Sequence, residues 1–530
     1  MTWMVAPIFV DSIDTALTHI HAARQAGAEA LELRCDRTGP QDLETLLRHP
    51  QVRQGRVIVT VRSAEEGGQF TGSEEERLSL LALSCRGRPD FVDVEWAAWQ
   101  RSAQWRRVLG QLIAPWGSGP DDQRPRLIIS RHDFSGPPRY PEAELAELAG
   151  VPEASILKMA FRARSVHDAL TALRLYEIAR RLGPRPLVSI AMDEAGQISR
   201  LLAGKFGAAF TFAASPGHGG TAPGQPRLTD LKGVYRLDRQ RADWRVFGVV
   251  GWPIAHSLSP ALHNAGFAAL DFPGVYVPLP IAPGYESFAA AVDALRQWPQ
   301  MNLGGLSITI PHKENAYRYL QERDGTMDPT ASQTRALNTL FFRAEGSLGG
   351  LNSDGVGALG ALAEALCIAP AGLSQYRVAV LGAGGAARGI VAALAACGAS
   401  IVIYNRTLAR AAELARAFTG AAGKITAAPL QDFRHTTCQI VINCTPAGMT
   451  PNVETLPLPP GASLRPDMVV FDTVYNPRET RLLRLARQCG ARTVEGLEML
   501  LRQAAVQFEG FTGQRAALNA MRQAVSSAHK

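Results

Sequence analysis

The chain has 530 residues, of which 46% are hydrophobic and 19% are charged, and its formal net charge is +7. This length exceeds what one hydrophobic core supports and predicts two to four domains, while the composition excludes wholesale disorder. The arginines are scattered and no nucleic-acid-binding motif is present, so we expect small anionic ligands rather than nucleic acid.

The cysteines, the first residues and the apolar stretches indicate the cellular compartment of the protein. Seven cysteines follow no metal or disulfide spacing, which is typical of a protein in a reducing cytoplasm, and we expect no metal site. The first residues lack a basic segment and reach Asp11 early, so no signal peptide is expected. The longest apolar stretches, such as 389–404, contain glycine and are typical of a helix followed by a strand rather than a membrane span. The oligomeric state stays open.

Residues 1–230 alternate short apolar runs with helical patterns. Eight runs are candidate strands: 5–10, 29–34, 56–61, 90–95, 126–131, 155–160, 186–191 and 208–212. Eight strands with helices between them predict a (β/α)8 barrel. Polar residues such as Glu32, Arg62, Asp93 and His132 stand where these strands end. In a barrel those ends meet at one mouth, where active sites lie, so we expect a site there.

Lys158 stands in the sixth of these runs, between apolar neighbours. Either its stem is buried and its ammonium reaches the barrel rim, or it is a neutral amine, because burial and nearby arginines disfavour the charge. A neutral amine forms a Schiff base with a ketone. His132 would then exchange protons near neutral pH, and Glu66 would orient the imidazole.

Seven motifs follow one another through this half: residues 32–36, 60–62, 66–68, 130–134, 158, 198–201 and 222–225. In this order they resemble type I 3-dehydroquinate dehydratase. The resemblance implies that Lys158 is the Schiff-base lysine and His132 the general acid and base. It also implies substrate contacts from six residues: Glu32, Arg34, Arg62, Arg200, Thr221 and Gln225. Thr221 stands where the family usually has serine, and residues 215–220, with a non-catalytic His218, are expected to form a mobile lid.

After a charged tether at 231–243, a fresh strand starts the second half. Ser257 and Ser259 stand at a helix start, where they either cap the helix or donate to a ligand carboxylate. Lys313 also stands at a helix start, where an ammonium is unfavourable unless a ligand or carboxylate lies nearby. Asp354, before a glycine, is either a turn residue or the acid partner of Lys313.

Residues 378–396 run from an apolar strand through a glycine cluster into an alanine-rich helix, as in the opening of a dinucleotide-binding unit. Gly382 permits the tight turn, Gly384 lets the backbone approach a pyrophosphate, and the helix start attracts phosphate. After the next strand, Asn405 and Arg406 stand where an NAD site would carry a carboxylate, which suits the 2′-phosphate of NADP.

Together with residues 337–339, 350–355, 442–449, 471–477 and 496–503, these motifs resemble shikimate dehydrogenase across residues 245–520. The resemblance implies that Lys313 and Asp354 are catalytic. It implies substrate binding by Ser257, Ser259, Thr309, Asn338, Tyr475 and Gln503. It implies NADP(H) binding by Gly382, Ala383, Gly384, Gly385, Ala386, Asn405, Arg406, Thr407, Arg410, Thr445 and Gly496.

Three places in the chain depart from that family's pattern. Ser353 replaces the usual threonine before Asp354, and Arg335 and Ala336 precede residues 337–339 where the family favours Ile-Gly-Ala. Residues 496–499 lengthen the usual Gly-Met-Leu, and a change in the shape of the nicotinamide pocket is the expected effect.

Both halves together resemble the fused dehydratase–dehydrogenase of the shikimate pathway. The expected fold is α/β, with a TIM barrel at 1–230, a substrate lobe at 244–355 completed by helices at about 498–530, and a Rossmann lobe at 356–497. Lys158 would add to the ketone of 3-dehydroquinate, and His132 would remove the neighbouring proton and help water leave. NADPH would then reduce the product, 3-dehydroshikimate, to shikimate, with Lys313 supplying the proton.

Three alternatives remain. The chain is an aldolase-like Schiff-base enzyme fused to another NADP reductase, or its second half acts on quinate, or it is a regulatory protein that uses both domains as ligand-binding modules. The ordered motifs weigh against the first. The presence of Lys158, His132, Lys313 and Asp354 weighs against the third, since a pure binding module does not need them.

Overall fold

The structure is a computed structural model that describes residues 2–216, 224–343 and 345–528. By contacts the chain divides into two compact units. The first comprises Met1–Arg245, Pro273–Ile281 and Asp293–Asn302, and the second comprises the remaining segments from Val246 to Lys530.

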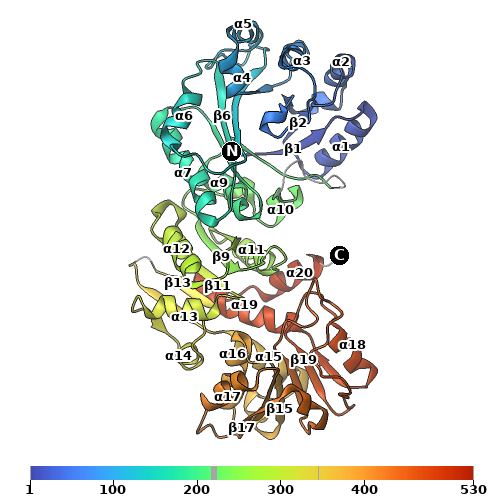
Figure 1. Cartoon of the computed structure of the whole chain (residues 1–530), viewed down its shortest axis with the longest axis vertical. Helices are drawn as coiled ribbons and strands as arrows, with labels where there is room; N and C mark the ends of the chain where they lie inside the picture. The colour runs from blue at the N-terminus through green and yellow to red at the C-terminus, as the bar shows by residue number, and fades with distance from the viewer. Residues whose placement is uncertain (1, 217–223, 344, 529–530) are drawn as a thin grey trace. The chain divides into compact units, whose positions relative to one another are not determined.

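The first unit is built on an eight-stranded sheet that curls into a barrel (Figure 1). Its strands are β1 (Trp3–Phe9), β2 (Ala30–Arg34), β3 (Arg56–Thr60), β4 (Phe91–Glu95), β5 (Arg126–Asp133), β6 (Ala154–Arg162), β7 (Leu187–Met192) and β8 (Phe210–Phe212). They run in the order β7-β6-β5-β4-β3-β2-β1-β8 with parallel pairing, and the amide of Ala209 donates to the carbonyl of Leu187 at 2.9 Å where the two edges meet. The predicted (β/α)8 barrel is confirmed.

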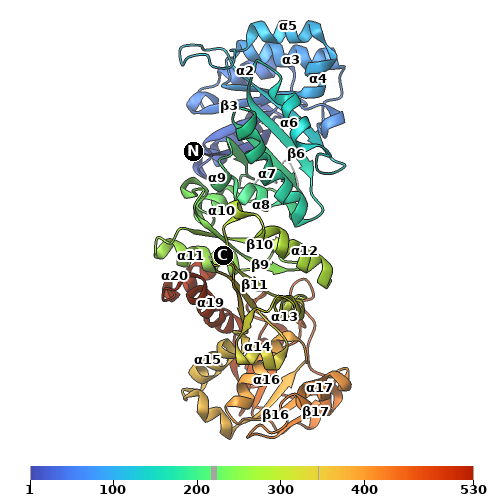
Figure 2. The ribbon, with the colours of Figure 1, turned by 90° about the vertical axis from the view of Figure 1, so that its left-hand side faces the viewer.

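Helices connect the strands of the barrel (Figure 2). They are α1 (Ile13–Gln25), α2 (Pro40–Arg48), α3 (Glu74–Arg86), α4 (Trp96–Arg101), α5 (Ala103–Leu112), α6 (Pro141–Ala149), α7 (Val166–Leu182), α8 (Ile198–Leu201), α9 (Ala203–Phe206) and α10 (Leu228–Gly233). A capping box between Ser73 and Glu76 starts α3. Buried apolar side chains of the strands, Ile58, Ile128 and Val188 among them, form one core cluster of the barrel.

A mixed six-stranded sheet carries the strands from residue 245 to residue 351, in the order β10-β9-β11-β13-β14-β12. Its strands are β9 (Arg245–Gly251), β10 (Gly274–Pro280), β11 (Leu303–Ile308), β12 (Thr326–Met327), β13 (Thr339–Phe342) and β14 (Leu348–Leu351). The helices in and beside it are α11 (Ser259–Ala269), α12 (Tyr285–Arg296), α13 (Lys313–Gln321), α14 (Pro329–Thr334), α19 (Gly496–Thr512) and α20 (Leu518–Ala528). The last two come from the end of the chain and pack against α11.

The third sheet is wholly parallel, with the order β17-β16-β15-β18-β19-β20. Its strands are β15 (Arg377–Leu381), β16 (Ser400–Asn405), β17 (Ile425–Pro429), β18 (Ile440–Asn443), β19 (Val469–Asp472) and β20 (Arg492–Val494). Four helices belong to it: α15 (Asp354–Leu366), α16 (Gly385–Ala396), α17 (Leu408–Arg416) and α18 (Arg481–Gln488). Its strand order is that of a dinucleotide-binding Rossmann fold, which confirms the predicted fold of this lobe.

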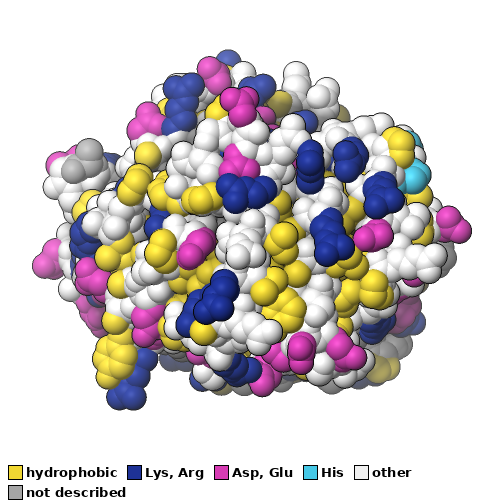
Figure 3. Space-filling view, turned by 90° about the horizontal axis from the view of Figure 1, so that it is seen from above, with side chains coloured by type: hydrophobic (Ala, Val, Ile, Leu, Met, Phe, Trp, Pro, Cys, Tyr) yellow, Lys and Arg dark blue, Asp and Glu magenta, His cyan; other side chains and the backbone are white. Residues whose placement is uncertain are grey.

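Within the described ranges, no helix is long and apolar enough to cross a membrane. On the face shown in Figure 3, basic and acidic side chains are interspersed among apolar and neutral ones, as the scattered charges of the sequence predict.

Candidate active sites

Lys158, on β6, meets two carboxylates from other strands of the barrel. Its Nζ lies 2.8 Å from Oδ2 of Asp93, on β4, and 3.8 Å from Oε1 of Glu32, on β2. The Lys158 residue is only 3% exposed. The sequence left two interpretations of Lys158 open, a lysine that reaches the barrel rim and a buried amine. In the structure its Nζ is buried and donates to Asp93.

Arg62 extends the ion pair into a network. Its Nη2 donates to Oδ1 of Asp93 at 2.8 Å, and its Nη1 donates to the hydroxyl of Ser130 at 3.0 Å and lies 3.1 Å from Oε1 of Glu95. Burial alone would raise the pKa of the Asp93 carboxyl, but Arg62 and Lys158 hold it well below its usual range. The carboxyl of Asp93 is therefore an anion that bridges two buried cations.

His132 and Glu66 form the pair that the sequence predicts. Nδ1 of His132 lies 2.8 Å from Oε2 of Glu66, which also accepts from the backbone amide of His132 at 2.9 Å. Burial raises the pKa of Glu66 to about 7. Burial, then Arg62 and Lys158, lower the pKa of His132 well below its ordinary value. Burial thus favours the uncharged form of both groups, and the proton exchange expected of His132 stays a prediction.

Arg200 is a buried cation with unused donors. It is 2% exposed, and its Nε and Nη1 atoms have no hydrogen-bond partner among the residues that the structure describes. Burial lowers its pKa to about 10. A buried guanidinium with free donors is costly by itself, so an anionic ligand group is the partner that it fits.

The other predicted dehydratase residues lie as follows. Arg34 is paired with Asp36 at 2.7 Å, and Glu32 accepts from the hydroxyl of Thr60 at 2.9 Å. Gln225 lies in the described segment before α10. Thr221 and His218 fall outside the described residues.

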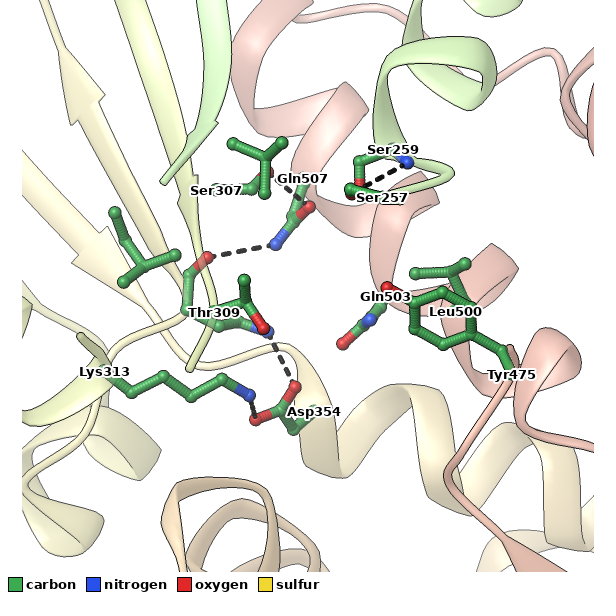
Figure 4. A pocket seen from close by; sticks show the side chains of 13 residues that line it. Ser257, Ser259, Ser307, Thr309, Lys313, Asp354, Tyr475, Leu500, Gln503 and Gln507 are labelled. Atoms are coloured by element: carbon green, nitrogen blue, oxygen red, sulfur yellow. Dashed lines mark hydrogen bonds and ion pairs between the residues drawn. The ribbon is translucent and has the colours of Figure 1, made fainter. Parts of the chain in front are cut away.

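One pocket gathers all eight residues predicted to bind or act on substrate in the second half (Figure 4). They are Ser257, Ser259, Thr309, Lys313, Asn338, Asp354, Tyr475 and Gln503. Val249, Ile308 and Leu500 add apolar surface to it. These residues come from strand ends, helices and loops, and the first and last of them stand more than 200 positions apart, so the fold alone brings them together.

Lys313 and Asp354 form an ion pair in this pocket. Lys313 is the first residue of α13 and Asp354 the first of α15, and the other oxygen of Asp354 accepts from Nδ2 of Asn338 at 3.0 Å. The carboxylate that Lys313 needs at its helix start is therefore present. Gln503 points into the pocket in Figure 4, and its buried Oε1 has no hydrogen-bond partner within the described part of the chain.

Two lining residues were missed by the sequence reasoning. The hydroxyl of Ser307 donates to Oε1 of Gln507 at 2.7 Å, and Nε2 of Gln507 donates to the carbonyl of Asn338 and the hydroxyl of Thr339, both at 3.1 Å. The signal was present, because Gln507 stands four residues after Gln503 and so shares its helix face. In the barrel, Asp93 was placed at a strand end without a role, and Ser130 received none.

The glycine cluster between β15 and α16 has the geometry of a phosphate-binding turn. Gly382 has a φ of +103°, and a Cβ there would lie 3.0 Å from Thr445. Gly384 precedes α16, and a Cβ on it would meet no atom within 4 Å, so the helix start is open. Gly385 lies close to Lys313, since a Cβ there would be 3.1 Å from its Cδ. Ala383 and Ala386 belong to the same turn.

Beyond β16, Arg406, Thr407 and Arg410 are exposed, and Nδ2 of Asn405 donates to the carbonyl of Thr407 at 2.9 Å. Gly496 starts α19, and a Cβ there would lie 2.5 Å from the carbonyl oxygen of Val474, next to Tyr475. The predicted cofactor residues thus follow the carboxyl ends of the parallel strands, where dinucleotides bind in this fold.

Comparisons with known proteins agree with both halves. The family model of type I 3-dehydroquinase matches residues 4–242. The model of the shikimate dehydrogenase substrate binding domain matches residues 249–340, and the model of shikimate / quinate 5-dehydrogenase matches residues 363–481. The model of the shikimate 5'-dehydrogenase C-terminal domain matches residues 496–525.

Two relatives and one solved structure illustrate the likeness. The chain is 35% identical over 526 residues to the chloroplastic bifunctional 3-dehydroquinate dehydratase/shikimate dehydrogenase of Arabidopsis thaliana, covering 96% of this chain and 81% of that protein. It is 41% identical over 288 residues to the shikimate dehydrogenase (NADP(+)) of Methanosarcina barkeri. That match covers 54% of this chain and 98% of the relative. One solved structure is the crystal structure of a shikimate dehydrogenase in complex with NADP+, whose sequence is 34% identical to this chain. The match covers 55% of this chain and 98% of that one, with a TM-score of 0.49. This chain belongs to the family of bifunctional 3-dehydroquinate dehydratase/shikimate dehydrogenases.

Proposed function

We propose that the barrel dehydrates 3-dehydroquinate through a Schiff base on Lys158 and that the second half reduces the resulting 3-dehydroshikimate to shikimate with NADPH. One observation carries this proposal: each half gathers, from separate segments, a lysine beside a buried aspartate. Lys158 is paired with Asp93, and Lys313 is paired with Asp354.

In the barrel, the ammonium of Lys158 first loses a proton to water, and the neutral amine then adds to the ketone carbon. Loss of water gives an iminium ion that acidifies the neighbouring C–H bond. His132 is largely buried, and its lowered pKa favours the neutral imidazole. Its Nδ1 faces Glu66, so its Nε2 is the nitrogen available to remove that proton. The same nitrogen then returns a proton to the departing hydroxyl. Water hydrolyses the iminium ion and frees Lys158 and 3-dehydroshikimate. Arg200, with its buried unused donors, fits the carboxylate of the substrate.

The second half has a site that suits NADPH. The left-handed Gly382 and the open helix start at Gly384 suit a pyrophosphate, and Arg406 suits a 2′-phosphate. When bound, NADPH supplies hydride to a ketone. Lys313 gives a proton to the oxygen that becomes the hydroxyl, while Asp354 holds the ammonium in place. The orphan oxygen of Gln503 accepts from a substrate hydroxyl.

For the domains we propose a dehydratase barrel at 1–230, a tether at 231–243, a substrate lobe at 244–355 with the C-terminal helices from about 498 to 530, and an NADP-binding lobe at 356–497. The family-model boundaries and the packing of α20 on α11 support this division. All seven cysteines are free, which supports a cytoplasmic protein.

The test is to incubate the protein with 3-dehydroquinate and NADPH and follow shikimate by mass spectrometry. Borohydride added with 3-dehydroquinate should leave a covalent adduct on the chain. Lys158→Ala should abolish the adduct and the dehydration, yet still reduce added 3-dehydroshikimate at a near-normal rate. An adduct that persists in Lys158→Ala would contradict the Schiff-base assignment, and oxidation of quinate in preference to shikimate would contradict the assignment of the second half.

A further inference from the structure

A row of buried charges of alternating sign leads from Lys158 to helix α3. Lys158 binds Asp93 at 2.8 Å, Asp93 binds Arg62 at 2.8 Å, Arg62 lies 3.1 Å from Glu95, and Glu95 binds Arg77 at 2.7 Å. Each of these five side chains is at most 4% exposed. Four of them stand on or just after barrel strands, and the fifth, Arg77, stands on α3 outside the strands.

Arg77 is fully engaged within the protein. Its Nη1 donates to the carbonyl of Val61 at 2.6 Å and to Oε2 of Glu95, and its Nε and Nη2 donate to Glu74, each at 2.7 Å. The Glu74 side chain is 40% exposed, so the row of charges ends at solvent. Well-packed apolar residues often replace a buried ion pair without loss of stability. Stability alone therefore does not explain why α3 carries a buried arginine here.

Glu95 connects Arg77 to the segment that holds Glu66. Its Oε1 accepts from the backbone amide of Ser63 at 3.0 Å, and Ser63 immediately precedes the short 3-10 turn Ala64–Glu66. Glu66 in turn holds His132. The charged groups around Glu66 come from four elements: Arg62 after β3, Asp93 and Glu95 on β4, His132 on β5 and Arg101 on α4. The Arg77–Glu95 pair thus touches both parts of the dehydratase site, through Arg62 and through the Ser63 turn.

We propose that Arg77 and Glu95 are positioning residues of the dehydratase, which set the charge balance around Lys158 and Glu66 and thereby the pH range in which the barrel works. This inference rests on the proposed Schiff-base function. Both residues act through others, Arg62 and the Ser63 turn.

The proposal predicts shifts of opposite sign. Arg77→Gln leaves one excess negative charge in the row, which favours the protonated form of Glu66. Glu66 acts in its deprotonated form, so the acid limb of the pH–rate profile of the dehydratase moves to higher pH. Glu95→Gln leaves one excess positive charge and moves the limb to lower pH. For charges at these depths, each shift is on the order of half to one pH unit.

The double variant Arg77→Gln/Glu95→Gln removes one charge of each sign, so its acid limb should return close to that of the unaltered protein. The matched control is Arg101→Gln, because Arg101 pairs with Glu65 beside Glu66 but both side chains are more than half exposed. Solvent screens such a pair, so we expect its profile to stay in place.

The experiment measures dehydratase kcat from pH 5 to pH 10, roughly the span over which these groups titrate, in the full-length protein and the four variants. The dehydrogenase activity of the same chains reports their concentration. The fraction of chains that carry the borohydride adduct, measured by mass spectrometry, reports the fraction of folded barrels. Opposite shifts that cancel in the double variant support the proposal. Two single variants that lose activity with unshifted profiles, or that shift in the same direction, would show that the pair serves the fold alone.

Should Arg77→Gln yield no folded barrel, Arg77→Lys takes its place. Arg77→Lys keeps the charge and should keep the profile, while Glu95→Gln must still move the limb to lower pH; an unshifted Glu95→Gln profile overturns the proposal. Failure of the underlying function looks different, because the unaltered protein would then give no borohydride adduct.

Discussion

The amine of Lys158 lies 2.8 Å from one carboxylate oxygen of Asp93, and the other oxygen of Asp93 lies 2.8 Å from Arg62. Asp93 is 1% exposed, so this carboxylate is the shared anion of two buried cations. Burial alone would raise the pKa of Asp93, but Arg62 and Lys158 lower it. The folded barrel therefore favours the ionised carboxylate.

Asp93→Asn should destabilise the barrel by about 3–5 kcal/mol, because it leaves two buried cations without their anion. Because the pKa of Asp93 is lowered in the folded state, its contribution is fully present above about pH 4 and is lost as the pH falls further. Denaturant unfolding as a function of pH measures this. The variant should lose that acid dependence and keep its dehydrogenase rate. Equal stability of the two proteins at pH 7 would contradict the role assigned to Asp93.

The sequence predicted the barrel because its eight apolar runs and their spacing are local signals. It also identified Lys158 as a candidate for the Schiff-base lysine, since a lysine between apolar neighbours stands out. The pairing of Lys158 with Asp93 was not predictable in the same way. The two residues stand on strands separated by β5, and the stagger of a barrel decides which side chains meet across it.

Arg77 was hidden for another reason. The stretch from Ser73 to Arg77 has the pattern of a capping box followed by charged residues, as at many exposed helix starts. Only the structure shows that the guanidinium turns inward to Glu95. The same holds for the pocket of the second half. The motifs identified eight lining residues, but Ser307, two residues before Thr309, was given no role, and Gln507 lies beyond the last motif.

Glu66→Gln should change the pH dependence of dehydration. The pKa of Glu66 is raised to about 7 by burial, so the unaltered enzyme should gain activity as this group ionises near neutral pH. Glutamine does not ionise, so the limb near pH 7 should vanish and kcat should fall by roughly 10- to 100-fold. The measurement is kcat against pH with 3-dehydroquinate. A limb that stays near pH 7 in the variant would assign it to another group.

The raised pKa of Glu66 also has a consequence for stability. The folded barrel binds this proton more tightly than the unfolded chain, so the stabilisation is present below about pH 4 and is lost as the pH rises through 7. Compared with Glu66→Gln, the unaltered barrel should therefore lose stability between pH 5 and pH 8. Thermal unfolding at several pH values checks this, and parallel curves for the two proteins would contradict it.

Arg406→Ala should weaken NADPH far more than NADH. Arg406 is exposed beyond β16, where a charge-assisted contact with the 2′-phosphate is worth about 1.5–3 kcal/mol. The KM for NADPH should rise by roughly 10- to 100-fold, with little change in the use of NADH. Steady-state reduction of 3-dehydroshikimate with each cofactor provides the measurement. Equal losses with both cofactors would place Arg406 at a phosphate common to both, or in the fold.

Lys313 and Asp354 should act as one unit in the reductase. They are the first residues of two different helices, and Asn338 fixes the oxygen of Asp354 that Lys313 leaves free. Lys313→Ala removes the proton donor, and Asp354→Ala removes the group that holds it, so each should lower kcat by roughly 100- to 10,000-fold.

A double-mutant cycle on the reduction of 3-dehydroshikimate distinguishes one shared step from two independent ones. If Lys313 transfers the proton and Asp354 only holds it, then once Lys313 is gone the loss of Asp354 has little left to remove. The double variant should therefore be about as slow as the slower single variant. The KM for NADPH should stay close to normal throughout, and the dehydratase activity of each chain serves as its internal control. Two large losses that simply multiply in the double variant would show that the residues serve different steps.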